Sequence, residues 1–155
     1  MASSVAAPHV VGPRRWRHSA SVAVAVDTNV IVRFLVKEPL AQYLRARGLM
    51  EKVARGEVEL RISAAVVGEV AAVLHHVYDQ TQRDVAEKLL ALVTSRGVDL
   101  DEAAHVVAAL ERSRDLRDVD FVDAYVAAKA VAEALPVASF DKGLHKKLGV
   151  TVFDL

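Results

Sequence analysis

The chain has no cysteine among its 155 residues. This absence excludes a disulfide framework, a thiolate metal site and a cysteine nucleophile, and it agrees with a reducing compartment, so a cytoplasmic location is expected. A long apolar run is missing as well, because the stretch from Ser19 to Val26 is interrupted by small residues and stops at Asp27. Such a stretch is too short to cross a bilayer, and we expect no membrane partner.

An excess of basic residues is also absent, since 20 Lys and Arg balance 20 Asp and Glu. Residues 1–26 contain Arg14, Arg15 and Arg17 and no acid, which leaves 17 basic against 20 acidic residues, a balance of −3, in the rest of the chain. No strongly basic body therefore indicates nucleic-acid binding. Contact with nucleic acid would have to come from local basic patches.

What the chain does have is apolar material, with 53% hydrophobic residues in a length typical of one domain. Residues 1–20 combine Ala, Ser, Pro and Arg without an acid, and this composition predicts a flexible N-terminal extension. We expect one folded domain over residues 21–155.

Within that domain, short β-like apolar runs alternate with longer helical ones. Strands are predicted at 22–26, 58–62, 98–100, 136–138 and 150–153. Helices are predicted near 28–36, 39–55, 64–78, 82–95, 101–113, 121–134 and 141–148. This alternation favours an α/β fold, with a parallel sheet and helices on both of its faces.

Four acidic residues lie in or beside apolar stretches: Asp27, Glu69, Asp123 and Asp141. Asp27 directly follows an apolar strand, and Glu69 is the only charge between residues 63 and 74. Burying one ionised carboxylate costs several kcal/mol or more unless a cation or hydrogen bonds compensate. Four such residues suggest one shared cation.

The predicted topology gives these acids a common place. Ligands of open parallel α/β sheets bind at the carboxyl ends of the strands, where Asp27 and Asp141 are both expected. Glu69 and Asp123 lie on helices that begin at the same edge, so convergence of the four is expected.

Each acid also has a simpler explanation. Asp27 and Asp141 could cap the helices that follow them, and Glu69 could turn to solvent or pair with an Arg. Asp120 could cap the next helix with Asp123 as its partner three residues later. In the functional interpretation, Asp123 is a ligand and Asp120 caps the helix or supports it.

A site of carboxylates without cysteine suits Mg²⁺ or Mn²⁺, which prefer hard oxygen ligands. Metal ions of this kind activate water and stabilise the leaving oxygen when a phosphodiester is hydrolysed. Phosphodiester hydrolysis is therefore the predicted reaction class.

At this level of detail the chain resembles the PIN-domain nucleases, and within them the VapC toxins of type II toxin–antitoxin (VapBC) systems. The resemblance covers roughly residues 22–155 and rests on four motifs: Val26-Asp27-Thr28-Asn29-Val30-Ile31, Val67-Gly68-Glu69-Val70, Asp120-Phe121-Val122-Asp123-Ala124-Tyr125-Val126-Ala127-Ala128, and Ala138-Ser139-Phe140-Asp141-Lys142.

The resemblance implies a three-layer α/β/α sandwich with a central parallel sheet and a Mg²⁺-dependent endoribonuclease blocked by a VapB-like antitoxin. It also implies that the four acids form the catalytic and metal-binding quartet, with Asp27 and Asp123 as direct ligands. In the same resemblance Thr28 and Asn29 brace the first carboxylate, and Ser139 is the small hydroxyl residue before the last acid.

Arg33, six residues after Asp27, is the first choice for contact with the RNA substrate. The six histidines lack a partner motif, which favours surface or packing roles. Apolar helical faces at 40–53 and 85–93 suggest core packing first, and otherwise a homodimer or a groove for an antitoxin helix.

Two other functions remain open. Asp27 after a buried strand is also similar to the nucleophile of haloacid dehalogenase-like phosphatases, although the second acid expected two residues later is Asn29. Alternatively, the chain is a non-catalytic PIN-like binding module.

Overall fold

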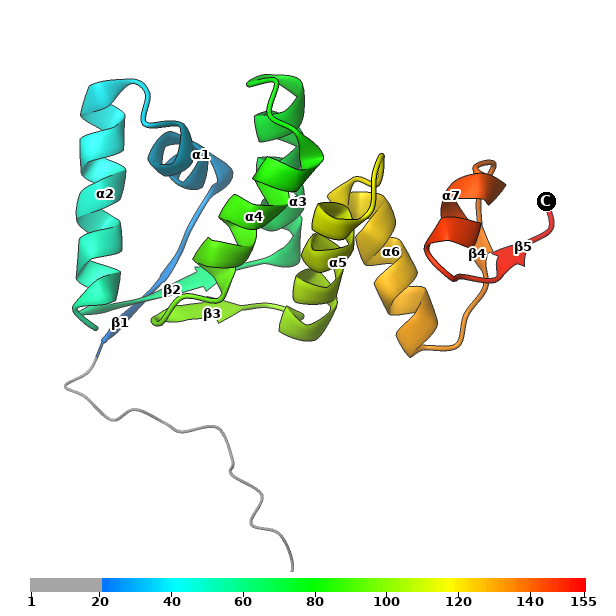
Figure 1. The fold of residues 1–155 in the computed structure, drawn as a ribbon. Helices are drawn as coiled ribbons and strands as arrows, with labels where there is room; N and C mark the ends of the chain where they lie inside the picture. The colour runs from blue at the N-terminus through cyan, green and yellow to red at the C-terminus, as the bar shows by residue number, and fades with distance from the viewer. Residues whose placement is uncertain (1–20) are drawn as a thin grey trace, which may run out of the picture.

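The computed structural model describes residues 21–155, so the extension predicted at 1–20 lies outside the described residues (Figure 1). The strands are β1 (Val22–Ala25), β2 (Val58–Ile62), β3 (Val98–Leu100), β4 (Val137–Ala138) and β5 (Val152–Phe153). The helices are α1 (Thr28–Val36), α2 (Leu40–Ala54), α3 (Ala64–His76), α4 (Gln82–Val93), α5 (Ala103–Asp115), α6 (Phe121–Ala132) and α7 (Lys142–Lys147). All predicted elements are present, and their ends agree within two residues.

The fold is α/β, with parallel strands flanked by helices, as an α/β/α sandwich requires. Parallel pairing joins β1 to β2 from Val22 opposite Val58, and β2 to β3 from Leu60 opposite Val98. The strand order is therefore β1-β2-β3, with β2 in the centre. Each connection passes through helices, because parallel strands need a crossover.

The expectation that Asp27 and Asp141 follow strands at one edge of the same sheet is wrong for this arrangement. Strands β4 and β5 pair with each other in a separate sheet. Together with α7 they form a C-terminal unit, residues 137–155, which Figure 1 shows on the far side of α6 from β1. With only two residues in each of these strands, few ladder hydrogen bonds are available to hold the unit against the main sheet.

Strand β1 consequently has one unpaired edge among the described residues. Its side chains are largely open to solvent, and Val22 is 63% exposed. An apolar strand of a parallel sheet is ordinarily covered on both faces, and a bare apolar edge is a template for another strand. The sequence of β1 is thus that of an interior strand, although its position here is at an edge.

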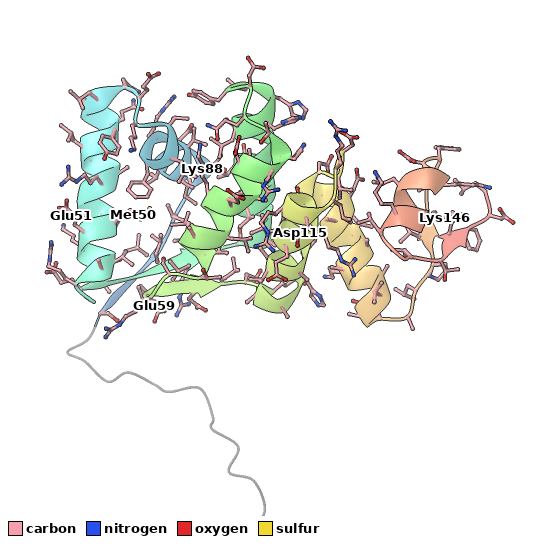
Figure 2. The ribbon with its side chains drawn as sticks, viewed as in Figure 1. Met50, Glu51, Glu59, Lys88, Asp115 and Lys146 are labelled. Atoms are coloured by element: carbon pink, nitrogen blue, oxygen red, sulfur yellow. The ribbon has the colours of Figure 1, made fainter. Side chains whose placement is uncertain are left out.

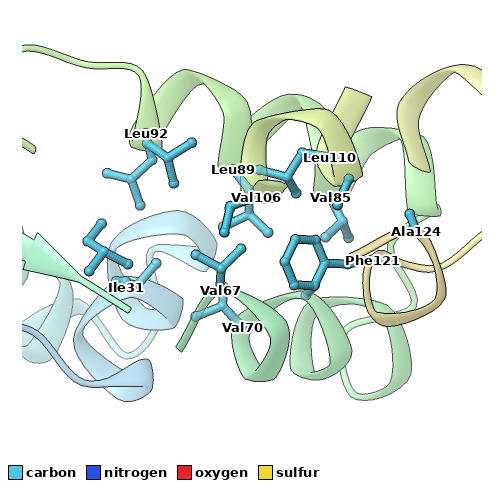
Figure 3. Close-up of a cluster of buried hydrophobic side chains, with 14 of the residues drawn as sticks. Ile31, Val67, Val70, Val85, Leu89, Leu92, Val106, Leu110, Phe121 and Ala124 are labelled. Atoms are coloured by element: carbon cyan, nitrogen blue, oxygen red, sulfur yellow. The ribbon is translucent and has the colours of Figure 1, made fainter. Parts of the chain in front are cut away.

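The core lies among β2 and helices α1–α6, and it also includes Leu148 and Val150 of the C-terminal unit. Leu60 and Ile62 of β2 are buried together with side chains from the helices. Figure 3 shows Ile31, Val67, Leu89 and Phe121 within this cluster. The face of α4 that the sequence left open between core and interface is core, because Val85, Ala86, Leu89, Leu92 and Val93 are buried.

Charged side chains cover the outside of the helices and of β2, as the labelled Glu51, Glu59 and Lys88 illustrate (Figure 2). Arg47 and Glu51 form an exposed ion pair of 2.8 Å one turn apart on α2. Pairs of this kind contribute roughly 0–1 kcal/mol each, so the apolar core accounts for most of the stability. Among residues 21–155, no helix has the length and apolarity needed to cross a membrane.

Candidate functional site

Asp27 stands between β1 and α1 and caps that helix. Its Oδ1 accepts a hydrogen bond from the backbone N of Val30 at 3.1 Å, with the extended backbone that an N-cap requires. Only one carboxylate oxygen is used in this way. The other oxygen has no partner within the described chain, so the side chain remains free to bind a further group.

Glu69 accepts a hydrogen bond from Thr28, the residue that follows Asp27. The buried hydroxyl of Thr28 donates to Glu69 Oε2 at 2.5 Å, which joins the start of α1 to the middle of α3. Helix α3 is capped by Ser63, whose Oγ accepts from the backbone N of Val66. The expectation that Thr28 braces Asp27 is therefore corrected: the Asp27 carboxylate turns to its own helix, and Thr28 orients Glu69.

A groove opens beside Asp27 between α1 and α2. Its volume is about 530 Å³, and it is lined by Asp27, Asn29, Val30, Arg33, Gln42, Arg45, Ala46 and Leu49. Half-buried Arg33 donates from Nη1 to the Tyr78 hydroxyl at 2.8 Å, and its buried Nε has no partner. The predicted RNA-contacting residue thus lies on the same groove as the first acid. Asn29 lines the groove too, beside Asp27 but without a hydrogen bond to it in the described chain.

Asp120 and Asp141 lie near enough to Asp123 for their negative charges to act on it. Asp120 Oδ1 accepts from the backbone N of Asp123 at 2.8 Å and caps α6. Asp141 Oδ1 accepts from the backbone N of Leu144 at 2.8 Å and caps α7. Ser139 supports the last acid, because its Oγ accepts from the backbone N of Asp141 at 3.0 Å.

Asp123 is the titratable group of this cluster with a perturbed protonation equilibrium. Partial burial raises the pKa of the Asp123 carboxyl above its ordinary 3.8, and the negative charges of Asp120 and Asp141 raise it further. The nearby His145 acts in the opposite direction. A raised pKa means that the folded protein holds the proton more tightly than the unfolded chain, so ionisation of Asp123 lowers the stability as pH rises above about 3.8.

We therefore expect the Asp123→Asn variant to gain stability relative to the unmodified protein as pH rises from about 4 to 7. Thermal unfolding in chelator across this pH range measures the difference in Tm. Asp154→Asn provides the control, because the Asp154 side chain is 99% exposed. A difference in Tm that does not change with pH, or changes equally in the control, would contradict the burial of Asp123.

His145 is one of the six histidines for which surface or packing roles were expected, and it is buried. It is only 3% exposed, lies near Asp123, and its Nδ1 is buried without a partner. The available signal was its position four residues after Asp141, one turn along α7.

The structure does not bring the four predicted acids together. Asp27 and Glu69 lie beside Thr28 in the main body, whereas Asp123 and Asp141 lie where α6 meets the C-terminal unit. Among residues 21–155, no three His, Cys, Asp or Glu side chains are close enough to hold a metal ion jointly. Carboxylate oxygens have the right chemistry for Mg²⁺, but their arrangement here does not fit the ion. The reason is topological, since β4 pairs with β5 instead of β1.

The capping roles of Asp27, Asp120 and Asp141, considered above as simpler explanations, are present in the structure. In each cap the bond uses Oδ1, so capping fixes the carboxylate and leaves its second oxygen available.

Comparison with known proteins identifies the family. No curated protein and no solved structure matches the chain. The family model described as PIN domain matches residues 24–149, which include all four acids. Domains of this family are of the nuclease type, act on nucleic acid and generally bind divalent metal ions such as Mg²⁺. Since the match spans most of its length, the chain belongs to the PIN-domain family.

Proposed function

We propose that the protein is a Mg²⁺-dependent endoribonuclease, with Mn²⁺ as a substitute, and the VapC-like toxin of a toxin–antitoxin pair. The observation that carries this proposal is that Asp27 lines a groove together with Arg33, while the next residue, Thr28, donates a hydrogen bond to Glu69. Arg33 would neutralise a phosphate while Asp27 stands beside the bond to be cleaved.

The active state in this proposal has the C-terminal unit against the main sheet. The unpaired edge of β1 supports this, because β4 is also parallel in its pairing and offers a free edge of its own. Asp27 comes two residues after β1, and Asp141 comes three residues after β4. Parallel alignment of the two strands would therefore bring both carboxylates to one edge.

Engineered cysteines test this closure directly, since the chain has none of its own. In the Ala25→Cys/Ala138→Cys variant we expect oxidation to form an intramolecular disulfide, because neighbouring strands lie about 4.8 Å apart. Mass spectrometry of the oxidised protein locates the bond. A matched variant carries Ala91→Cys, on the exposed surface of α4, in place of Ala25→Cys, and should keep both thiols free. Free thiols in both variants would contradict the closure.

The activity itself is tested with a panel of structured RNAs, incubated with Mg²⁺, with Mn²⁺ or with chelator. We expect cleavage with either metal, none in chelator, and none by the Asp123→Ala variant prepared in the same way. Cleavage by that variant would show a contaminant or a mechanism that does not use Asp123. Metal uptake measured by calorimetry gives a second readout that does not depend on finding the right RNA.

A cytoplasmic VapB-like antitoxin and a homodimer belong to the same proposal. Leu40 and Leu44 of α2 are 66% and 51% exposed, so this helix offers apolar side chains to a partner. A contact there agrees with either an antitoxin helix or a second copy.

The second candidate is a non-catalytic PIN-like binding module, and the separation of the acids favours it. The two candidates differ in one result: a binding module would hold RNA or a protein partner without metal-dependent cleavage. The Asp27→Asn variant would then behave like the unmodified protein.

A further inference from the structure

Arg45 is a cation on the wall of the groove that the nuclease site does not use. It lies on α2, across the groove from Arg33 on α1. Within the described chain Arg45 forms no hydrogen bond or ion pair. Its neighbours three and four residues away on α2 are Ala41, Gln42, Gly48 and Leu49, so no acid one turn away compensates the charge.

The groove combines two cations, two amides and apolar side chains beside Asp27. Arg33 and Arg45 provide two positive charges, which suit successive phosphates. Gln42 and Asn29 provide amides that can donate and accept hydrogen bonds. Val30, Ala46 and Leu49 provide apolar surface against which a base can lie. The volume of about 530 Å³ is within the usual range for binding pockets, roughly 300–1,000 Å³.

The groove links Asp27 with helix α2. Asp27 lines it together with residues of α2, so a strand bound there would lie beside both. Because the body of the protein is mildly acidic, RNA binding requires a local basic patch, and the two arginines of the groove provide one.

We propose that the groove between α1 and α2 binds the single-stranded RNA segment that flanks the cleaved bond, and that Arg45 and Gln42 are its binding residues on α2. This inference rests on the proposed function for the identity of the nucleic acid. Arg45 contacts a phosphate, and Gln42 lies one turn before it on the same face.

Binding without cleavage tests the proposal. A labelled single-stranded RNA is titrated in chelator at several salt concentrations, by fluorescence anisotropy. Arg45→Ala should weaken binding by on the order of three- to tenfold and reduce the slope of log K against log[salt] by about 0.7, the value for one phosphate of a single strand. Gln42→Arg, an exposed change that adds a charge to the wall, should tighten binding and raise the slope by about the same amount.

Arg47→Ala is the matched control. It removes the same charge from the same helix, but Arg47 is paired with Glu51 and does not line the groove. We expect it to bind RNA like the unmodified protein. Equal losses for Arg45→Ala and Arg47→Ala would show a general charge effect and overturn the proposal. Unchanged binding by Arg45→Ala would overturn it too, and would leave the groove to a protein helix.

The failures of the two proposals can be told apart. If Arg45→Ala lost affinity for RNA but the unmodified protein never cleaved RNA with Mg²⁺, the RNA-binding role of the groove would stand and the nuclease proposal would be rejected. If the protein cleaved RNA with metal and Arg45→Ala had the same KM and kcat, the nuclease proposal would stand and the RNA-binding role of the groove would be rejected.

Discussion

Replacing Asp27 by Asn is expected to lower the rate of metal-dependent RNA cleavage by about 10²–10³-fold, the usual loss when one group that stabilises the transition state is removed. The substitution removes one negative charge and little else. Asn is as good an N-cap as Asp, so the bond to the backbone N of Val30 and the start of α1 should persist. Single-turnover cleavage with saturating protein measures the rate, and circular dichroism verifies the fold.

Two further variants separate charge from capping. Asp27→Ala removes both, and should cost about 1 kcal/mol of stability in addition to the loss of cleavage. Asp115→Asn makes the same chemical change at an exposed acid paired with Arg114, and should cleave normally. If Asp27→Asn cleaved RNA at the rate of Asp115→Asn, the proposed role of Asp27 would have to be abandoned.

Truncating Phe121 to Ala is expected to lower the free energy of unfolding by about 3–5 kcal/mol, a large part of the roughly 5–15 kcal/mol typical of a domain. Phe121 is 4% exposed and begins α6. Its ring lies where a methyl group added at Gly68 would touch it at 3.5 Å, and it stacks on Tyr125 with ring centroids 5.7 Å apart. Removing the ring would leave a cavity between α3 and α6 (Figure 3).

Urea denaturation measures this loss, with Val122→Ala as the neighbouring control. Val122 is 54% exposed, so its truncation should change stability by about 0.5 kcal/mol or less. Phe121→Leu should fall between the two. Equal stability of the Phe121 and Val122 variants would show that α6 is not held in this way.

The helices could be predicted because their signals are local. Asp120 is an N-cap in the structure, as the sequence indicated, and apolar spacing defined the helix that follows it. Strand β2 was predicted to the residue for the same reason, because apolar Val58, Leu60 and Ile62 alternate with charged residues. The hydrogen bond from Thr28 to Glu69 was harder to predict, because the two residues are 41 positions apart and a hydroxyl in a sequence does not indicate its acceptor.

The candidate site was predictable in its residue types and only partly in its geometry. Thr28, next to Asp27, hydrogen-bonds Glu69, and the charge of Asp141 acts on Asp123, but among the described residues no three such side chains are close enough to hold a metal ion. His145 could not be selected from the six histidines, because burial beside Asp123 depends on how α7 packs.

The sequence by itself determined the order and type of the elements, the capping residues and membership in the PIN-domain family, since all of these depend on local pattern and motif. Only the tertiary structure decided which strands pair with each other. In the described residues β4 pairs with β5 and leaves β1 open, and this separates Asp27 from Asp141. The physical reason is that backbone hydrogen bonds between strands do not depend on side-chain identity, so a short apolar strand carries no signal that specifies its neighbour.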